Sequence, residues 1–338
     1  VKTLVSDNHE IFIQSNAGNE IGFTDLAYIE AGASILQSPQ EIYSASELII
    51  KVKEPMQQEL KYLRKGLTLF TYLHLAGDLS MAKEILKTGV TGIAYETVTN
   101  ENGALPLLAP MSAIAGQLSV VVGSYHLLKP NQGRGTLIGK LDPRIVSVIG
   151  GGVAGNEAIT KSLANGARVK VLDLSQKKLN ELKLQHGQTN IEYIISNPST
   201  IEDAISVSDL VIGSVYVVGK QAPKVVTKEM LKSMTKGSVM VDISIDQGGC
   251  FESSRPTEHD NPTFLEEGVL HYCVTNMPGA VPLTATKALN EATLPYILEL
   301  ANKGIDLALR ENIHLANGLN IKDGEIMHSA LLELMPTS

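Results

Sequence analysis

Three ionisable side chains end apolar segments of the chain and have the types needed to move protons around a small carbonyl compound. His74 closes the run LTLFTYLH, Lys53 closes LIIKVK, and Asp246 follows VDISI. An imidazole donates or accepts a proton near neutral pH, and an ammonium can hold a carboxylate or a carbonyl oxygen. A carboxylate can orient water or ammonia. These residues are therefore candidates for acid–base catalysis and substrate binding.

Each of these side chains also has an ordinary structural interpretation. A histidine on a buried strand is usually a core or strand-end residue, and lysines on an apolar strand can keep a sheet edge solvated. Asp246 lies beside a pair of glycines and could cap the amides of a turn. We favour chemistry for His74 and Lys53 because both end predicted strands, where open α/β sheets bind their ligands. For Lys51 we prefer the structural role of keeping the strand edge solvated.

A second set of candidates surrounds a glycine-rich turn. The segment RIVSVIGGGVAG carries Gly150, Gly152 and Gly155 between a predicted strand and a predicted helix. The first glycine permits a tight turn, the second lets backbone N–H groups approach a pyrophosphate, and the third allows close helix–strand packing. Asp173 ends the next predicted strand, where a carboxylate can accept the ribose hydroxyls and repel a 2′-phosphate. This pattern predicts a dinucleotide site that prefers NAD to NADP.

Alternating strands and helices must position these residues. Apolar runs predict one series of strands at 10–15, 48–53, 67–74 and 92–96, with helices at 24–36 and 79–89. A second series is predicted at 144–149, 168–173, 191–195, 209–214, 238–244 and 270–274. Because side chains alternate along a strand, we expect Phe70, Tyr72 and His74 to share one face of their strand. For the same reason we expect Asp242, Ser244 and Asp246 to share one face of theirs. The alternation of strands and helices predicts an α/β fold with mainly parallel sheets.

The chain is long enough for two domains. A long apolar helix predicted within 106–130 connects the two strand series. The last helical pattern, 292–312, has no strand left to pack on in the second series, so we expect it to return to the first. The sequence therefore predicts two Rossmann-like domains. The NAD-binding domain, 109–283, is inserted in a discontinuous catalytic domain of 1–108 and 284–338.

Composition excludes several classes of protein. The formal charge is −8, and no Lys/Arg-rich run interrupts the sequence, so we expect no nucleic-acid partner. Cys250 and Cys273 are too few for a disulfide framework and lack metal-site spacing, and the histidines form no metal constellation. No apolar run approaches the length of a membrane span, and the N-terminus carries no signal-peptide pattern. We expect a soluble, cytoplasmic protein without a metal.

Longer segments resemble the alanine dehydrogenase family over nearly the whole chain. They are IIKVKEP (49–55), LFTYLHLA (69–76), LPLLAPMSAIAG (105–116), GGGVAG (150–155), VDISIDQGGCFESSRPTEHDNPTF (241–264) and HYCVTNMPGAVPLTATKALNEATLPY (271–296). The family also includes pyridine nucleotide transhydrogenases. The resemblance implies the reaction of L-alanine, NAD and water to give pyruvate, ammonium and NADH, together with its reverse. It also implies a homo-oligomer, expected to be a hexamer.

The resemblance also assigns residues. It implies that His74 is the catalytic acid/base beside the substrate carbonyl and that Asp246 assists catalysis of the water and ammonia steps. It also implies that Lys53 binds the carboxylate of pyruvate and polarises its carbonyl. The positions that match the family's NAD contacts are Ser112, Asp173, Lys178, Asn276 and Met277. Without the resemblance, a lysine at position 178 would be interpreted as part of a solvated helix start.

The family's opening segment has no counterpart in this sequence. Members begin with a strand bearing a PKE-type motif, followed by an arginine that clamps the substrate carboxylate. Val1 lies inside the helix that should follow, so both are expected to be absent, and none of the arginines at 64, 134 and 255 matches the motif. Lysine replaces arginine poorly in such a role.

Other interpretations remain open. The nucleotide-binding component of a proton-translocating transhydrogenase shares this fold, but that family places an Arg-Gln-Asp loop where this chain has APMSAIAGQ (109–117). A catalytically silent NAD-binding relative is consistent with the missing arginine. A relative acting on another small amino acid is consistent with Phe70 and Tyr72, which set only a rough pocket size. Turnover of alanine with NAD distinguishes these alternatives.

Overall fold

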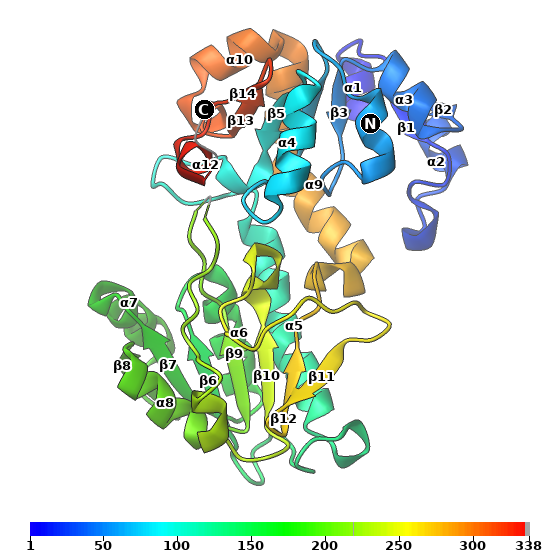
Figure 1. The fold of residues 1–338 in the computed structure, drawn as a ribbon. Helices are drawn as coiled ribbons and strands as arrows, with labels where there is room; N and C mark the ends of the chain where they lie inside the picture. Colours follow the sequence, from blue (N-terminus) through cyan, green and yellow to red (C-terminus); the bar gives the residue numbers. More distant parts are fainter. Residues whose placement is uncertain (219, 335–338) are drawn as a thin grey trace. The chain divides into compact units, whose positions relative to one another are not determined.

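The chain folds into two compact α/β units, shown in the computed structural model in Figure 1. The structure describes residues 1–218 and 220–334, so the end of the predicted 284–338 segment lies outside the described residues. Unit 1 comprises Val1–Leu108, Val218–Lys220 and Pro282–Ser338, and unit 2 comprises Ala109–Val217 and Gln221–Val281. The predicted α/β class is confirmed: the sheet of unit 2 is parallel except at one edge strand, and the sheet of unit 1 is mixed.

Unit 1 contains a five-stranded sheet with the order β14-β13-β5-β4-β3. The parallel strands are β3 (Leu48–Ile50), β4 (Thr68–Thr71) and β5 (Thr91–Ala94), and the antiparallel ones are β13 (Leu319–Lys322) and β14 (Glu325–Ile326). A separate parallel pair is formed by β1 (Phe12–Gln14) and β2 (Ser34–Leu36). The apolar side chains of β4, including Leu69 and Phe70, are fully buried, which fixes the strand that leads to His74.

Polar side chains cap several helices of unit 1. The helices of this unit are α1 (Lys2–Ser6), α2 (Asp25–Glu30), α3 (Pro39–Ala45), α4 (Leu79–Lys87), α9 (Pro282–Lys303), α10 (Ile305–Glu311), α11 (Ile313–Ala316) and α12 (Ser329–Leu334). The Asp78 carboxylate accepts hydrogen bonds from the first amides of α4, and Ser38 with Glu41 forms a capping box at α3. These caps fix where α3 and α4 begin.

Unit 2 contains a seven-stranded sheet with the order β11-β12-β10-β9-β6-β7-β8. Its strands are β6 (Ile145–Ile149), β7 (Arg168–Asp173), β8 (Ile191–Ile195), β9 (Leu210–Gly213), β10 (Val239–Asp242), β11 (Thr263–Glu266) and β12 (Val269–Tyr272). Only β11 runs antiparallel to its neighbour in this sheet. From β6 the chain builds outward in one direction through β7 and β8, and in the other through β9, β10 and β12. The order therefore reverses between β6 and β9, the point where doubly wound sheets bind ligands.

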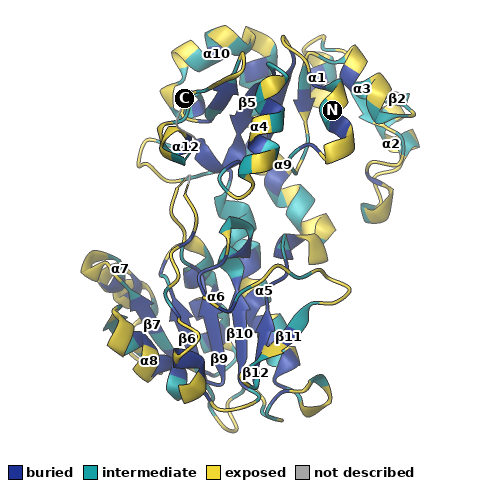
Figure 2. Ribbon diagram, viewed as in Figure 1, coloured by how far each residue is buried: buried dark blue, intermediate teal, exposed yellow. Residues whose placement is uncertain are grey.

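Helices cover both faces of this sheet. They are α5 (Ala109–His126), α6 (Val153–Ala164), α7 (Gln176–His186) and α8 (Pro198–Ser206). Alternate strand residues enter different cores: Val239 and Val241 of β10 pack with residues of α5 and α6, whereas Met240 packs with residues of α8. Figure 2 shows the central strands β6, β9, β10 and β12 largely in dark blue, because both of their faces are buried, whereas the flanking strands β8 and β11 are partly exposed. Within residues 1–218 and 220–334, no helix is long and apolar enough to cross a bilayer.

Several predicted elements are wrong at their ends. The strands β3, β4 and β10 stop at Ile50, Thr71 and Asp242, so the strand alternation predicted for Phe70, Tyr72 and His74 and for Asp242, Ser244 and Asp246 does not extend to the candidate residues. The predicted helix 24–36 is α2 followed by β2, because the chain turns at Gly32 with a φ of 93°. The predicted helix 292–312 belongs to α9 and α10, which are separated at Gly304 with a φ of 77°.

Candidate active site

The three glycines of the turn after β6 have different physical roles. Gly150 has a φ of 100°, and an added Cβ would lie 2.6 Å from the carbonyl oxygen of Ser214. At Gly155, in the first turn of α6, a Cβ would lie 1.9 Å from the carbonyl oxygen of Gly150. Gly152, by contrast, has an ordinary φ of −65°, and nothing lies within 4 Å of its Cβ position. Only Gly152 faces open space beside the helix N-terminus, where a phosphate can approach.

The acid predicted to hold the ribose does lie at this turn. Asp173 ends β7, and its Oδ2 accepts a hydrogen bond of 2.7 Å from the backbone N–H of Gly151. Its Oδ1 accepts one of 2.8 Å from the N–H of Ser175. The Cγ of Lys178 would lie 3.1 Å from a Cβ on Gly151, while its ammonium pairs with Glu181 at 2.6 Å. The structure therefore brings Asp173 and the stem of Lys178 together at the glycine turn.

The remaining candidates of unit 2 lie on elements that follow β10 and β12 or pack against them. The Oδ2 of Asp246 accepts a hydrogen bond of 3.2 Å from the N–H of Asn276, whose φ is 55°. Met277 is buried in the core, so the amide of Asn276 is the freer of these two side chains for a ligand. Ser112 is half-buried in the first turn of α5, a helix that packs against the 3₁₀ turns holding Asp246 and Met277.

A buried carboxylate that the sequence did not single out organises the loop around Asp246. Asp242 is fully buried, and it accepts hydrogen bonds from the N–H of Ser244 at 2.9 Å, the N–H of Cys250 at 2.8 Å and the hydroxyl of Ser254 at 2.5 Å. Burial raises the pKa of Asp242 above its usual range, and burial likewise raises the pKa of the Cys250 thiol. Cys250 is fully buried in the apolar core, which favours packing over a role as a nucleophile. A strand-end aspartate preceding a glycine-rich loop was the available signal for Asp242.

In unit 1, His74 lies just beyond β4 in a left-handed backbone conformation with a φ of 47°. Its N–H donates a hydrogen bond of 2.7 Å to Oε1 of Glu96, which the sequence analysis missed. Its ring stacks on Tyr72, with centroids 5.7 Å apart and planes 13° apart. The Tyr72 hydroxyl donates to the carbonyl of Leu107 at 2.6 Å. His74 is half-buried. Glu96 binds its backbone N–H, and Tyr72 stacks on its ring.

Lys53 follows the strand adjacent to the one that leads to His74, because β3 pairs with β4. Its carbonyl oxygen accepts a hydrogen bond of 2.9 Å from the hydroxyl of Thr71, and its ammonium lies 3.8 Å from the carboxylate of Glu54. Its side chain is 37% exposed and so remains accessible to a substrate. The solvent role expected for Lys51 is wrong, because its ammonium pairs at 2.7 Å with the buried carboxylate of Glu59.

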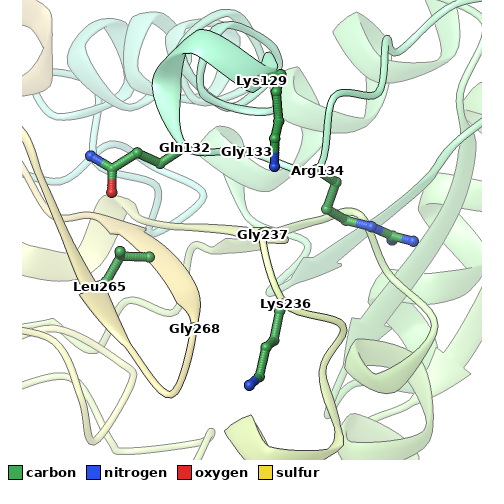
Figure 3. A pocket seen from close by; sticks show the side chains of 8 residues that line it. All are labelled: Lys129, Gln132, Gly133, Arg134, Lys236, Gly237, Leu265 and Gly268. Atoms are coloured by element: carbon green, nitrogen blue, oxygen red, sulfur yellow. The ribbon is translucent and has the colours of Figure 1, made fainter.

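A cavity of about 370 Å³ lies elsewhere in unit 2. Its lining includes Gly237 and Gly268, which precede β10 and β12, whereas the glycine turn follows the carboxyl end of β6. Lys129, Arg134 and Lys236 also line the cavity, and Figure 3 shows that their side chains do not converge on one point. The guanidinium of Arg134 is paired with the buried carboxylate of Asp209 at 2.7 Å. None of the predicted site residues lines this cavity. Among the described residues, no group of three or more His, Cys, Asp or Glu could hold a metal ion.

Comparisons with known proteins give a consistent result. Residues 1–115 match the N-terminal domain, and residues 119–329 the C-terminal domain, of the family described as Alanine dehydrogenase/PNT. The alanine dehydrogenase of Halomonas elongata is 46% identical over 335 residues, which are 98% of this chain and 90% of that protein. The alanine dehydrogenase of Mycolicibacterium smegmatis is 46% identical over 334 residues, with the same coverage.

A solved structure agrees with the sequence matches. An L-alanine dehydrogenase superimposes with a TM-score of 0.90 at 43% identity, covering 99% of this chain and 93% of that one. The similarity therefore extends through both units and includes every segment that carries a candidate residue.

Proposed function

The chain belongs to the alanine dehydrogenase/PNT family, and from this membership we propose that it catalyses the NAD-dependent oxidative deamination of L-alanine to pyruvate and ammonium, and the reverse amination. The observation that carries the proposal is the 46% identity to an alanine dehydrogenase over 98% of the chain. Identity at this level over both units supports a shared reaction, whereas a shared fold alone would not.

The geometry of unit 2 fits NAD. Gly152 leaves open the space beside the N-terminus of α6 that a pyrophosphate requires, and Asp173 places a carboxylate at the same turn for the adenosine ribose. Ser112, Lys178 and Asn276 would add further contacts, with the backbone of Met277 beside them. When bound, NAD supplies a hydride acceptor. We therefore assign the NAD-binding domain to 109–283 and the catalytic domain to 1–108 with 284–338.

The residues of the proposed reaction have distinct tasks. His74 acts as the acid/base that moves protons as water adds to the iminium carbon and ammonia leaves. Lys53 holds the substrate carboxylate and polarises the carbonyl of pyruvate, a task that suits its partly exposed ammonium. Asp246 assists the water and ammonia steps, and its carboxylate is oriented by a hydrogen bond from the N–H of Asn276.

Family membership supports two further proposals. We infer that the protein assembles as a homo-hexamer and that it acts in the cytoplasm on free L-alanine, pyruvate and ammonium. Light scattering of the purified protein tests the assembly, since a hexamer has about 6 times the mass of the chain. A monomeric mass in solution would contradict it.

The experiment that tests the function is a substrate panel. The purified protein is incubated with NAD or NADP and, in turn, L-alanine, D-alanine, L-serine and glycine, and NADH and pyruvate are both quantified. We expect L-alanine with NAD to give the highest kcat/KM and equal amounts of the two products. Tight NAD binding without turnover of any amino acid would overturn the proposal and support a catalytically silent relative. Higher kcat/KM for another amino acid would assign a different substrate.

A further inference from the structure

The backbone of His74 needs external support. A φ of 47° is a conformation that residues with a Cβ rarely adopt, and glycine adopts it at much lower cost. Glycine at this position would relieve the strain, but it would remove the imidazole. A histidine in this conformation therefore requires interactions that hold it there.

One carboxylate accepts two amides of this turn, and the carbonyl of His74 accepts a hydrogen bond of 2.8 Å from the N–H of Gly77. Oε1 of Glu96 accepts the N–H of His74 at 2.7 Å, and both carboxylate oxygens receive the N–H of Leu73, at 3.1 and 3.3 Å. Two consecutive amides thus point at the same anion, as in the anion-binding concavities formed by successive N–H groups. Charge-assisted hydrogen bonds of this kind are stronger than neutral ones. Glu96 fixes the turn that carries the imidazole.

The protein core fixes Glu96 in turn. Glu96 lies in the 3₁₀ turn Tyr95–Thr97 that follows β5, and β5 pairs in parallel with β4, so the two strand ends are adjacent. Glu96 is only 6% exposed, and its neighbour Tyr95 packs edge-on against the rings of Phe70 at 4.5 Å and Tyr72 at 5.0 Å. The carboxylate is therefore fixed in position, and it can hold the turn at residues 73–74 in place.

We propose that Glu96 is a positioning residue for catalysis: its carboxylate clamps the amides of Leu73 and His74 so that the imidazole, stacked on Tyr72, is held ready for proton transfer. The proposal rests on the proposed function, in which His74 is the acid/base. Glu96 acts through His74 and does not itself contact the substrate. Burying a carboxylate is costly, and these hydrogen bonds offset that cost in a way that also orients a functional group.

The test compares Glu96→Gln and Glu96→Ala with the wild type in alanine oxidation. The glutamine keeps Oε1 as an acceptor for both amides but loses the negative charge and the second acceptor for Leu73, so we expect kcat to fall about 10-fold, and about 100-fold for the alanine, as for small displacements of a catalytic group. The KM for NAD should not change.

A matched control separates positioning from general destabilisation. Ile85→Val removes a methylene from the buried core of the same unit, so it should lower Tm and leave kcat unchanged. An unchanged kcat in both Glu96→Gln and Glu96→Ala, or a KM for NAD that rises as much as kcat falls, would overturn the proposal.

A second readout separates this inference from the proposed function. If the wild type does not oxidise alanine, the proposed function fails. The clamp is then measured by amide hydrogen exchange of the peptide containing Leu73 and His74. We expect Glu96→Gln to lose protection there while the β4 amides keep theirs. Equal protection in both proteins would overturn the clamp itself.

Discussion

Alanine substitutions at two glycines of the same turn should separate coenzyme binding from folding. Gly152 and Gly155 are three residues apart, yet their surroundings are opposite. A Cβ at Gly152 meets nothing within 4 Å, whereas a Cβ at Gly155 would lie 1.9 Å from the carbonyl oxygen of Gly150 and 2.9 Å from the hydroxyl of Ser214. The same chemical change therefore tests space reserved for a ligand at one position and helix packing at the other.

The expected magnitudes follow from these distances. A carbon and an oxygen make contact at roughly 3.3 Å, so Gly155→Ala must displace α6 from the turn. Overpacking of this kind costs about 1–3 kcal/mol, or a Tm lower by about 2–12 °C for a unit of this size. Gly152→Ala has no clash and an ordinary φ, so the free energy of unfolding should stay the same or rise by about 0.4–1 kcal/mol. Its methyl group would occupy the space that the pyrophosphate needs.

The assay measures thermal unfolding without coenzyme and NAD binding by calorimetry. Gly152→Ala should keep its Tm and raise the dissociation constant of NAD by about 10-fold or more, equivalent to about 1.4 kcal/mol. Gly155→Ala should lower Tm and should also weaken the binding of NAD. Normal NAD affinity in Gly152→Ala would refute the assignment of this space to the pyrophosphate. A Tm loss in Gly152→Ala as large as that in Gly155→Ala would refute the packing argument.

Three further predictions use other residues. Asp173→Ala should raise the NAD dissociation constant, and Asp173→Asn, which keeps an acceptor for Gly151, should chiefly relax discrimination against NADP in a comparison of the two coenzymes. His74→Ala should abolish alanine turnover while leaving NAD affinity near normal; loss of NAD binding would indicate a structural histidine. Burial lowers the pKa of His271, so the unfolded chain binds more protons between that pKa and 6.5. Stability should therefore fall as pH decreases through this window, by at most about 1.4 kcal/mol per pH unit for this group, and His271→Gln should flatten the slope in denaturant titrations.

Much of the architecture could be predicted from local sequence patterns. The strands β7 and β8 coincide with their predictions, because short runs rich in Val, Leu and Ile mark them even where a face is partly exposed. The turn after β6 could be predicted because its glycines combine a left-handed φ with two close backbone approaches. Short strands such as β13 and β14 were missed, since they pair antiparallel at a sheet edge and depend on a partner far away in the sequence.

The site could be predicted only in part. The type of a side chain indicates which chemistry it can perform, but not which other residues hold it in position. His74 and Lys53 were recognisable from their places after apolar runs. The ends of β4 and β10 were not, since they depend on the left-handed His74 and on Asp242 capping the turn that follows it. Glu96 and Asp242 act by accepting backbone amides from loops 8 to 23 residues away, and no periodic pattern reports such contacts.

The most direct test of the proposed reaction follows the hydrogen on the alanine Cα. The protein is supplied with L-alanine deuterated at that carbon, and the NADH and pyruvate formed are analysed by mass spectrometry. We expect one deuterium in each NADH, one pyruvate for each NADH, and no such product from His74→Ala. NADH without deuterium, or pyruvate formed without NADH, would contradict hydride transfer from alanine.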